Sequence, residues 1–87
     1  MKACNLVGAD LSGENLTEAN LEGADLSGAN LKGANLKLAK LISVNLSKAQ
    51  LKGADITGVT FNKSNLSGID FSGSDLRGPK NFWDVNF

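Results

Sequence analysis

The side chains best suited to chemistry in this sequence are aspartates, asparagines and serines that recur at a fixed spacing. Rows of Asp and Asn oxygens can bind calcium, as in β-roll repeats, but those repeats need a nine-residue G-G-x-G-x-D-x-U-x pattern that is absent here. A serine becomes a nucleophile only beside an activating base, and the chain contains no histidine and no tyrosine. The serines expected to point outward therefore lack a base: Ser12, Ser27, Ser47, Ser67 and Ser72.

Metal and cofactor chemistry is not expected either. Cys4 is the single cysteine, so the chain can form neither a thiolate metal site nor an internal disulfide. Neither G-x-x-x-x-G-K-[ST] nor G-x-G-x-x-G occurs, and the glycines follow a five-residue period instead. We therefore expect no enzyme activity, no metal and no cofactor.

Length and composition set further bounds. Eighty-seven residues make one small domain, near the size at which a single core is only marginally adequate. Nine basic residues balance nine acidic ones, so no overall charge favours nucleic acid or an anionic membrane as a partner. The sequence has no apolar run of membrane-spanning length and no signal peptide, and with one cysteine the expected location is the cytoplasm.

A five-residue period runs through nearly the whole chain, as in GADLSGANLKGANLK at residues 23–37. Residues five apart are rotated by roughly 140° on an α-helix, and they alternate faces on a straight strand. Neither element can bury such a row, so the chain must turn one corner per repeat. The row of large apolar residues is Leu6, Leu11, Leu16, Leu21, Leu26, Leu31, Leu36, Leu41, Leu46, Leu51, Ile56, Phe61, Leu66, Phe71 and Leu76, and it resumes one residue late, after Pro79, at Phe82 and Phe87.

The other positions of the repeat have their own preferences. Two residues before each large apolar residue the chain is mostly small, and both positions should point inward because they share a face in an extended segment. One residue before it, Asn or Asp dominates, and these side chains hydrogen-bond nearby backbone. Two residues after it, Gly is commonest, because corners need conformations closed to other residues. We therefore interpret the Asn and Asp residues as structural.

The motif A-[DN]-L-x-x, repeated in register over residues 4–78, resembles the pentapeptide-repeat family. The resemblance implies an all-β fold, a right-handed quadrilateral parallel β-helix in which four pentapeptides complete one coil. About seventeen repeats then give about four coils, a rod about 20 Å tall at the strand spacing of a sheet. We expect one domain over residues 1–87, with repeats over about 4–78 and an aromatic cap over about 79–87.

Positions twenty apart should stack on the outside of such a solenoid. Lys32 then lies above Lys52, with Lys37 and Lys48 on flanking faces, which makes a modest basic patch. Such a patch is either a binding surface for a partner or simply a solvated face.

Residues 36–49 depart most from the repeat. Leu38, Ser43 and Lys48 stand where Gly is usual, and Ile42 occupies a position that is mostly polar. We expect Leu38 and Ile42 to face outward on either side of one corner, where adjacent apolar groups indicate a contact surface. The alternative is that the corner merely tolerates them.

The two ends also differ. GPKNFWDVNF breaks the register at Pro79 and gathers Phe82, Trp83 and Phe87, either as a cap on the core or as a docking site around Trp83. The N-terminal coil has no comparable plug, so end-to-end self-association through it is expected unless something blocks it. Glu14 takes an inward position there, which leaves three interpretations: it discourages edge pairing, the coil is loose, or the side chain reaches solvent.

Several functions remain compatible with this pattern. The leading one is a non-catalytic structural scaffold or protein–protein interaction module with an unidentified protein partner. The alternative is a DNA mimic that binds a type II topoisomerase (gyrase), as the resemblance implies for some members. This chain departs from those members in its zero net charge and its small number of coils. A third interpretation is that the chain is part of something larger or an idealised sequence.

Overall fold

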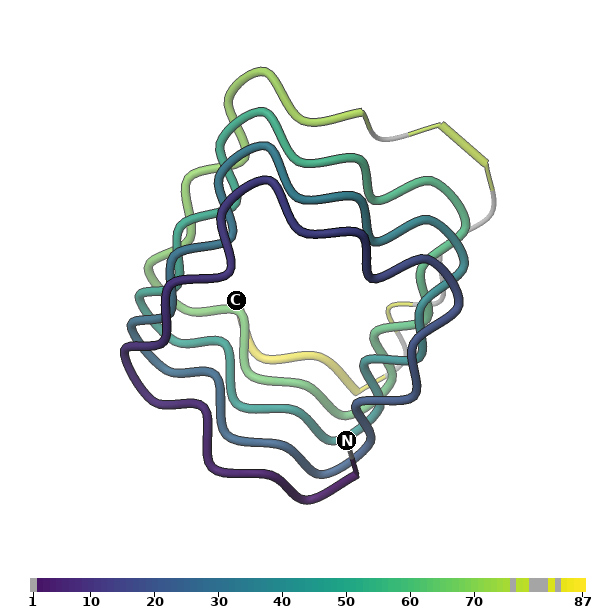
Figure 1. Cartoon of the computed structure of the whole chain (residues 1–87). Coiled ribbons are helices and arrows are strands. Elements are labelled where there is room, and N and C mark those ends of the chain that lie inside the picture. Colours follow the sequence, from purple (N-terminus) through teal and green to yellow (C-terminus); the bar gives the residue numbers. More distant parts are fainter. Residues whose placement is uncertain (1, 76, 79–81, 83) are drawn as a thin grey trace.

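The chain winds into stacked coils that pair edge to edge. The computed structural model describes residues 2–75, 77–78, 82 and 84–87. Parallel bridges join residues twenty apart, for example Asn5 to Asp25 and Asp25 to Asn45, so four pentapeptides complete each coil (Figure 1). The fold is a parallel β-helix solenoid, as the family resemblance implied, with one corner in every pentapeptide, as the five-residue period predicted.

Each pentapeptide contains one tight turn. At a representative repeat, the Ala29 amide donates to the Leu26 carbonyl at 3.0 Å. Within that turn Gly28 has φ +68°, in the left-handed region that favours glycine. The same position keeps a positive φ where glycine is missing: Ala3, Glu18, Leu38, Ser43, Lys48, Lys63 and Asp84. The corner conformation therefore belongs to the position and does not depend on the residue that occupies it.

Where the residue before a large apolar residue is Asn or Asp, its side chain stabilises the turn that follows. The Asn35 Oδ1 accepts the amide hydrogen of Lys37 at 3.1 Å, and the Asp25 Oδ1 accepts that of Ser27 at 3.1 Å. At Asn15 the same oxygen also accepts the hydroxyl hydrogen of Thr17 at 2.7 Å. These contacts support the structural interpretation of the Asn and Asp residues.

Pairing between coils is limited to single residues on each side. No helix and no continuous strand occurs in the described residues, where every bridge is isolated. Three backbone hydrogen bonds per pentapeptide nevertheless join neighbouring coils. The amides of Leu26 and Gly28 donate to the carbonyls of Asn45 and Ser47 in the next coil, at 2.7 and 2.9 Å. The amide of Asp25 donates to the carbonyl of Cys4 in the preceding coil, at 2.9 Å. A turn in every five residues leaves no room for a longer strand.

The core is a column of large and small side chains that alternate around the coil. The large apolar residues at every fifth position from Leu21 to Phe61 are fully buried, and Leu66 is 2% exposed. The alanines between them are buried as well. In the N-terminal coil Leu6, Leu11 and Leu16 are only half-buried, because no coil packs above them. Glu14 is exposed while its backbone stays hydrogen-bonded to Leu11 and Asn35, so its side chain reaches solvent from an ordered coil.

The register slips by one residue near the C-terminus, as the sequence predicted. Asn65 pairs with Asn86, twenty-one residues on. The ring of Phe82 stacks under that of Phe61 at 5.5 Å, and Phe87 lies 5.6 Å from Phe82. Phe82 and Phe87 remain 41% and 71% exposed, so together they cover the core only in part. Pro79 and Trp83, the other residues of the expected cap, lie outside the described residues.

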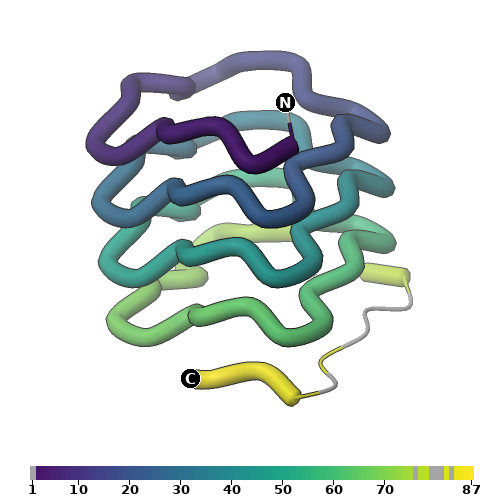
Figure 2. Tube along the Cα trace, turned by 90° about the horizontal axis from the view of Figure 1, so that it is seen from below, coloured from purple at the N-terminus to yellow at the C-terminus, as the bar shows by residue number. Residues whose placement is uncertain are grey.

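The solenoid is a short block and not the expected rod. Its principal extents are 27, 25 and 23 Å, and the stacked coils are about as high as they are wide (Figure 2). The difference has a simple cause, because about four coils at a spacing of ~4.8 Å span no more than one coil is broad.

Candidate functional site

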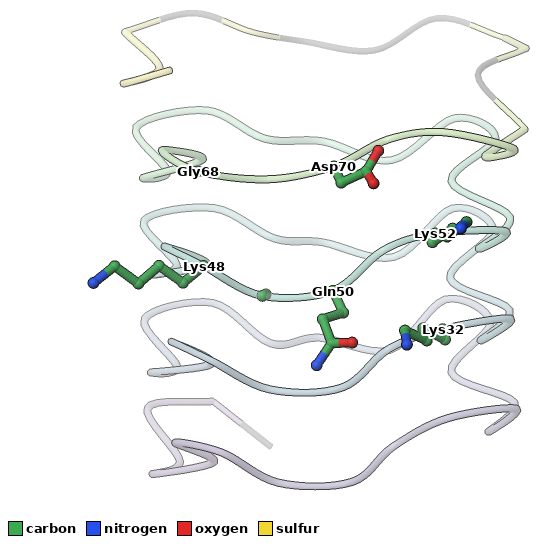
Figure 3. A pocket seen from close by; sticks show the side chains of 7 residues that line it. Lys32, Lys48, Gln50, Lys52, Gly68 and Asp70 are labelled. Carbon is green, nitrogen blue, oxygen red and sulfur yellow. The ribbon is translucent and has the colours of Figure 1, made fainter.

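Three lysines and a glutamine surround a shallow groove on one side of the solenoid. We call this side the lysine face. A groove of about 290 Å³ is lined by Lys32, Lys48, Ala49, Gln50, Lys52, Gly68 and Asp70. Lys48 projects from one edge, Lys32 and Lys52 lie at the other, and Gln50 and Asp70 lie between them (Figure 3). Of the four lysines expected to form a basic patch, Lys32, Lys48 and Lys52 line this groove, whereas Lys37 does not.

The repeat explains why these side chains meet. Residues 48–52 form one side of a coil, with a turn at each end. Lys32 belongs to the equivalent turn one coil earlier than Lys52, so the two ammonium groups lie on one edge. Lys48 adopts φ +61° at a corner where the neighbouring coils have Gly28 and Gly68. Lys48 is therefore the only long side chain among these three stacked corner positions.

Asp70 is the one carboxylate that lines the groove. The hydroxyl group of Ser72 donates to its Oδ1, and the Ser72 amide donates to the same oxygen at 2.9 Å. These two bonds, with the hydroxyl bond first, lower the pKa of Asp70, and the positive charge of Lys52 acts in the same direction. Asp70 therefore carries a negative charge at neutral pH at the C-terminal margin of the lysine face.

Sequence reasoning missed Gln50 and Asp70 as lining residues. Both occupy the position before a large apolar residue, and the bridges Asn30 to Gln50 and Gln50 to Asp70 place them in one column. The twenty-residue stacking that paired Lys32 with Lys52 would have found them too, because Gln50 and Asp70 lie in the segments that carry the lysines.

The apolar residues Leu38 and Ile42 lie on a different part of the surface. Leu38 is 49% exposed, whereas Ile42 is half-buried. They belong to successive turns, at residues 37–38 and 42–43, and flank one side of a coil that has the exposed Lys40 at its middle. The expectation that they sit on either side of one corner was wrong, because each turn begins directly after its large apolar residue.

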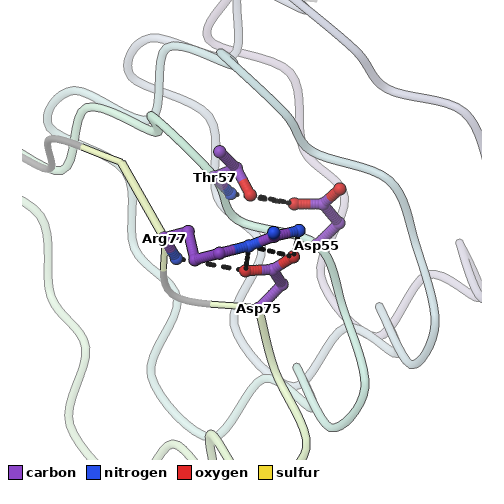
Figure 4. Close-up of polar contacts among 4 residues, drawn as sticks. All are labelled: Asp55, Thr57, Asp75 and Arg77. Carbon is purple, nitrogen blue, oxygen red and sulfur yellow. Dashed lines mark hydrogen bonds and ion pairs between the residues drawn. The ribbon is translucent and has the colours of Figure 1, made fainter.

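A second polar cluster, also missed in the sequence, lies on another side of the solenoid. Arg77 donates to both carboxylate oxygens of Asp75, with Nη2 at 2.7 Å from Oδ2 (Figure 4). One coil earlier the Thr57 hydroxyl donates to Asp55 at 2.6 Å. The Thr57 bonds lower the pKa of Asp55, and Asp75 raises the pKa of Arg77. The hydrogen bonds lie within each pair, between Thr57 and Asp55 and between Arg77 and Asp75, so this cluster stabilises the turns that carry them.

Two kinds of feature are absent from the part of the chain that the structure describes. No group of three or more Cys, Asp or Glu side chains there is placed to hold a metal ion. That part also contains no helix that could traverse a lipid bilayer. Trp83, which the sequence offered as a docking residue, lies outside the described residues.

The family model for pentapeptide repeats (8 copies) matches overlapping stretches of the chain, which together run from residue 4 to residue 87: 4–41, 19–58, 39–78 and 54–87. The chain belongs to the pentapeptide-repeat family. The match continues through the segment expected to form the cap, where Asn86 pairs with Asn65.

Solved pentapeptide-repeat structures resemble this chain over most of its length. A protein from the Arabidopsis thaliana thylakoid lumen is 31% identical over 95% of the chain, with a TM-score of 0.50. A protein from the cyanobacterium Nostoc is 25% identical over 97% of the chain and 80% of its own length, with a TM-score of 0.60. This pentapeptide-repeat chain spans 61% of the Arabidopsis protein.

A third structure shows the fold alone. QnrB1, a plasmid-mediated fluoroquinolone resistance protein, is 23% identical over 80% of the pentapeptide-repeat chain, with a TM-score of 0.70. The chain spans only 33% of QnrB1. No curated protein matches the sequence.

Proposed function

We propose that this pentapeptide-repeat chain is a non-catalytic scaffold or protein-interaction module built on a right-handed quadrilateral β-helix. Family membership and the parallel twenty-residue register support this architecture. The chain also lacks the histidine and tyrosine side chains that most often act as acids and bases. A partner protein would contact rows of side chains that the stacked coils hold in fixed positions.

The observation that carries this proposal is the apolar pair of Leu38 and Ile42. A leucine at a left-handed corner position is strained, yet Leu38 keeps φ +61° and leaves 49% of its surface in water. The same corner has Glu18 in the preceding coil and Gly58 in the next one, so Leu38 is the apolar residue in this stack of corners. Exposed apolar side chains on a polar surface are typical of contact surfaces.

The test compares capture of proteins from a lysate of the source organism by three forms of the chain. The wild type is compared with the double variant Leu38→Asp, Ile42→Asp. Val7→Asp is the matched control, because Val7 is 55% exposed on a different corner. We expect one partner to be captured by the wild type and by Val7→Asp, and lost from the double variant.

Two outcomes would contradict the proposal. Equal capture by all three forms would show that Leu38 and Ile42 are not the contact surface. No specific capture by any form would count against an interaction module. Circular dichroism of each variant establishes that the solenoid is intact before capture is compared.

The alternative function, a DNA mimic that binds a type II topoisomerase, fits the charges less well. A mimic of DNA needs a negative surface, whereas this chain has zero net charge and presents a lysine face. A supercoiling assay with purified gyrase separates the two functions. A mimic would inhibit gyrase or protect it, and we expect this chain to do neither.

A further inference from the structure

The zero net charge of the chain conceals a separation of charge along the solenoid. Between Asp25 and Asp55 the sequence contains five lysines and no acidic residue: Lys32, Lys37, Lys40, Lys48 and Lys52. The acidic residues lie before and after this stretch, four of them from Asp10 to Glu22. The middle of the solenoid is therefore basic, and its two ends are more acidic.

Three of the five lysines gather on the lysine face. Lys32, Lys48 and Lys52 line its groove and are exposed, whereas Lys37 and Lys40 lie on other sides of the coil. Among the described residues, the ion pairs join Lys2 to Glu22 and Arg77 to Asp75, away from the groove. The three lysines are thus exposed around one groove, with the exposed Gln50 between Lys48 and the other two (Figure 3).

We propose that the lysine face binds a short acidic peptide segment of a partner protein. The ammonium groups at both edges of the groove can pair with carboxylates, and Gln50 can donate a hydrogen bond to the peptide backbone or accept one from it. This inference rests on the proposed function as an interaction module and names the chemistry of one partner. It does not involve Leu38 or Ile42.

The length of the ligand is limited by the same column that contains Gln50. Asp10 lies two coils before Gln50 and Asp70 one coil after it, so a carboxylate bounds the basic window on each side. Coils are ~4.8 Å apart, which leaves room for a segment about 10 to 15 Å across. A long polyanion that followed the axis would meet these carboxylates and be repelled, whereas a few consecutive Asp or Glu side chains would fit.

Nucleic acid is the less suitable partner for a second reason. Proteins that bind single strands combine basic grooves with aromatic side chains on which bases stack. The groove is lined by lysine, alanine, glutamine, glycine and aspartate, and none of its lining residues is aromatic. The lysine face has positive charge but no aromatic side chain on which a base could stack, so it suits the carboxylates of a peptide better than a nucleic acid.

The test measures binding of a fluorescein-labelled hexaglutamate peptide to the purified chain by anisotropy at low salt. The face variant is Lys32→Gln, Lys48→Gln, Lys52→Gln. The control variant, Lys37→Gln, Lys40→Gln, Lys63→Gln, removes the same charge elsewhere. We expect the face variant to bind about tenfold more weakly than wild type, and the control variant to stay within about twofold. Binding should also weaken as salt is raised.

Three results would overturn the proposal. The first is wild type that binds hexaglutamate no more tightly than hexaglutamine. The second is an equal loss of affinity in both variants, and the third is tighter binding of a hexameric thymidine oligonucleotide than of the peptide. Should the triple variant fail to fold, Lys48→Gly replaces it, because Gly28 and Gly68 hold that corner in the neighbouring coils. Failure here with successful capture through Leu38 and Ile42 would refute the acidic ligand and leave the interaction module standing.

Discussion

Aspartate and asparagine side chains stabilise the turns of this chain, and at Asp10, Asp55 and Asp70 the turn favours the charged carboxylate. The Ser12 hydroxyl donates to Asp10 at 2.7 Å and the Thr57 hydroxyl donates to Asp55 at 2.6 Å. Each hydroxyl bond, with the backbone bond second, lowers the pKa of its aspartate, as at Asp70. Folding therefore favours the ionised carboxylates.

This coupling predicts a loss of stability in acid. A carboxyl group whose pKa is lower in the folded chain stabilises the fold above its unfolded pKa, and that contribution disappears as the pH falls through the folded value. The ordinary value is 3.8, so we expect the melting temperature to hold above about pH 5 and to fall below pH 4. Thermal unfolding followed by circular dichroism between pH 7 and pH 2.5 measures the effect.

The matched variant for this experiment is Asp10→Asn, Asp55→Asn, Asp70→Asn. Asparagine holds the same turn position at Asn30 and Asn35, so the acceptor oxygen is kept while the titrating group is removed. The acid-induced decrease should be smaller in this variant. An unchanged pH profile would show that other groups cause the decrease.

Ser64 provides a second test at the residue scale. It is 1% exposed and lies among apolar side chains, but its hydroxyl donates to the Leu41 carbonyl and accepts the Val44 amide hydrogen at 3.1 Å. Ser64→Ala removes both bonds and leaves buried backbone groups without this partner, so we expect a loss of about 1 to 3 kcal/mol. Urea unfolding gives the free energy.

Ser67→Ala is the control for Ser64, because the same atom is removed at a half-buried outward position in the next repeat. Its effect should stay below about 0.5 kcal/mol. If Ser64→Ala were equally mild, the buried hydroxyl would not be needed to link the coil of Ser64 to the coil of Leu41 and Val44.

At the scale of the turn, the corner position decides which substitutions the fold accepts. Gly58 has φ +69°, and a Cβ placed there would lie 2.7 Å from the Cδ2 of Leu38. Gly33 has φ +66° and nothing within 4 Å of the same added atom. We expect Gly33→Ala to cost about 1 kcal/mol through φ alone, and Gly58→Ala to cost more because Leu38 must also move.

Urea unfolding of the two alanine variants, each made with and without Leu38→Gly, separates the causes. Removing Leu38 should make Gly58→Ala as mild as Gly33→Ala. If the difference between the two variants persisted without Leu38, contact with that side chain would not be its source.

The turns also show where sequence reasoning stopped. Glycine at every fifth position predicted the corners, and the positive φ values confirm them even at Leu38, Ser43 and Lys48. Which residues flank a corner depends on where each turn begins, and the repeat alone does not give that. Leu38 and Ile42 were therefore assigned to one corner, although they belong to two.

For the whole molecule, the continuous core predicts cooperative unfolding. Leu46 is fully buried in the middle of the solenoid, with neighbouring coils on both sides. Leu46→Ala should cost about 2 to 5 kcal/mol, a large part of the stability of a domain this small. Differential scanning calorimetry should show one transition that moves to a much lower temperature.

Leu6→Ala is the matched control, because Leu6 is equivalent to Leu46 in the half-buried N-terminal coil. It should cost less, since the site is already partly open to water and leaves a smaller cavity. Equal effects of the two substitutions, or a Leu46→Ala variant that keeps most of the wild-type melting temperature, would contradict a continuous core.

The sequence by itself determined the solenoid, the identity of its inward residues, the register slip near the C-terminus and the stacking of Lys32 with Lys52. The solenoid and its inward residues follow from the strict local period, which recurs in every repeat, and the slip follows from the interruption of that period near Pro79. The stacking of the two lysines follows from the twenty-residue coil that the family resemblance implied. The tertiary structure decided how deeply the side chains of each repeat are buried, and that Gln50 and Asp70, but not Lys37, line the groove of the lysine face. It also decided that Ser64 forms hydrogen bonds between two coils. These features depend on which coil lies above and below and on the side chains met there, information that a five-residue repeat does not contain.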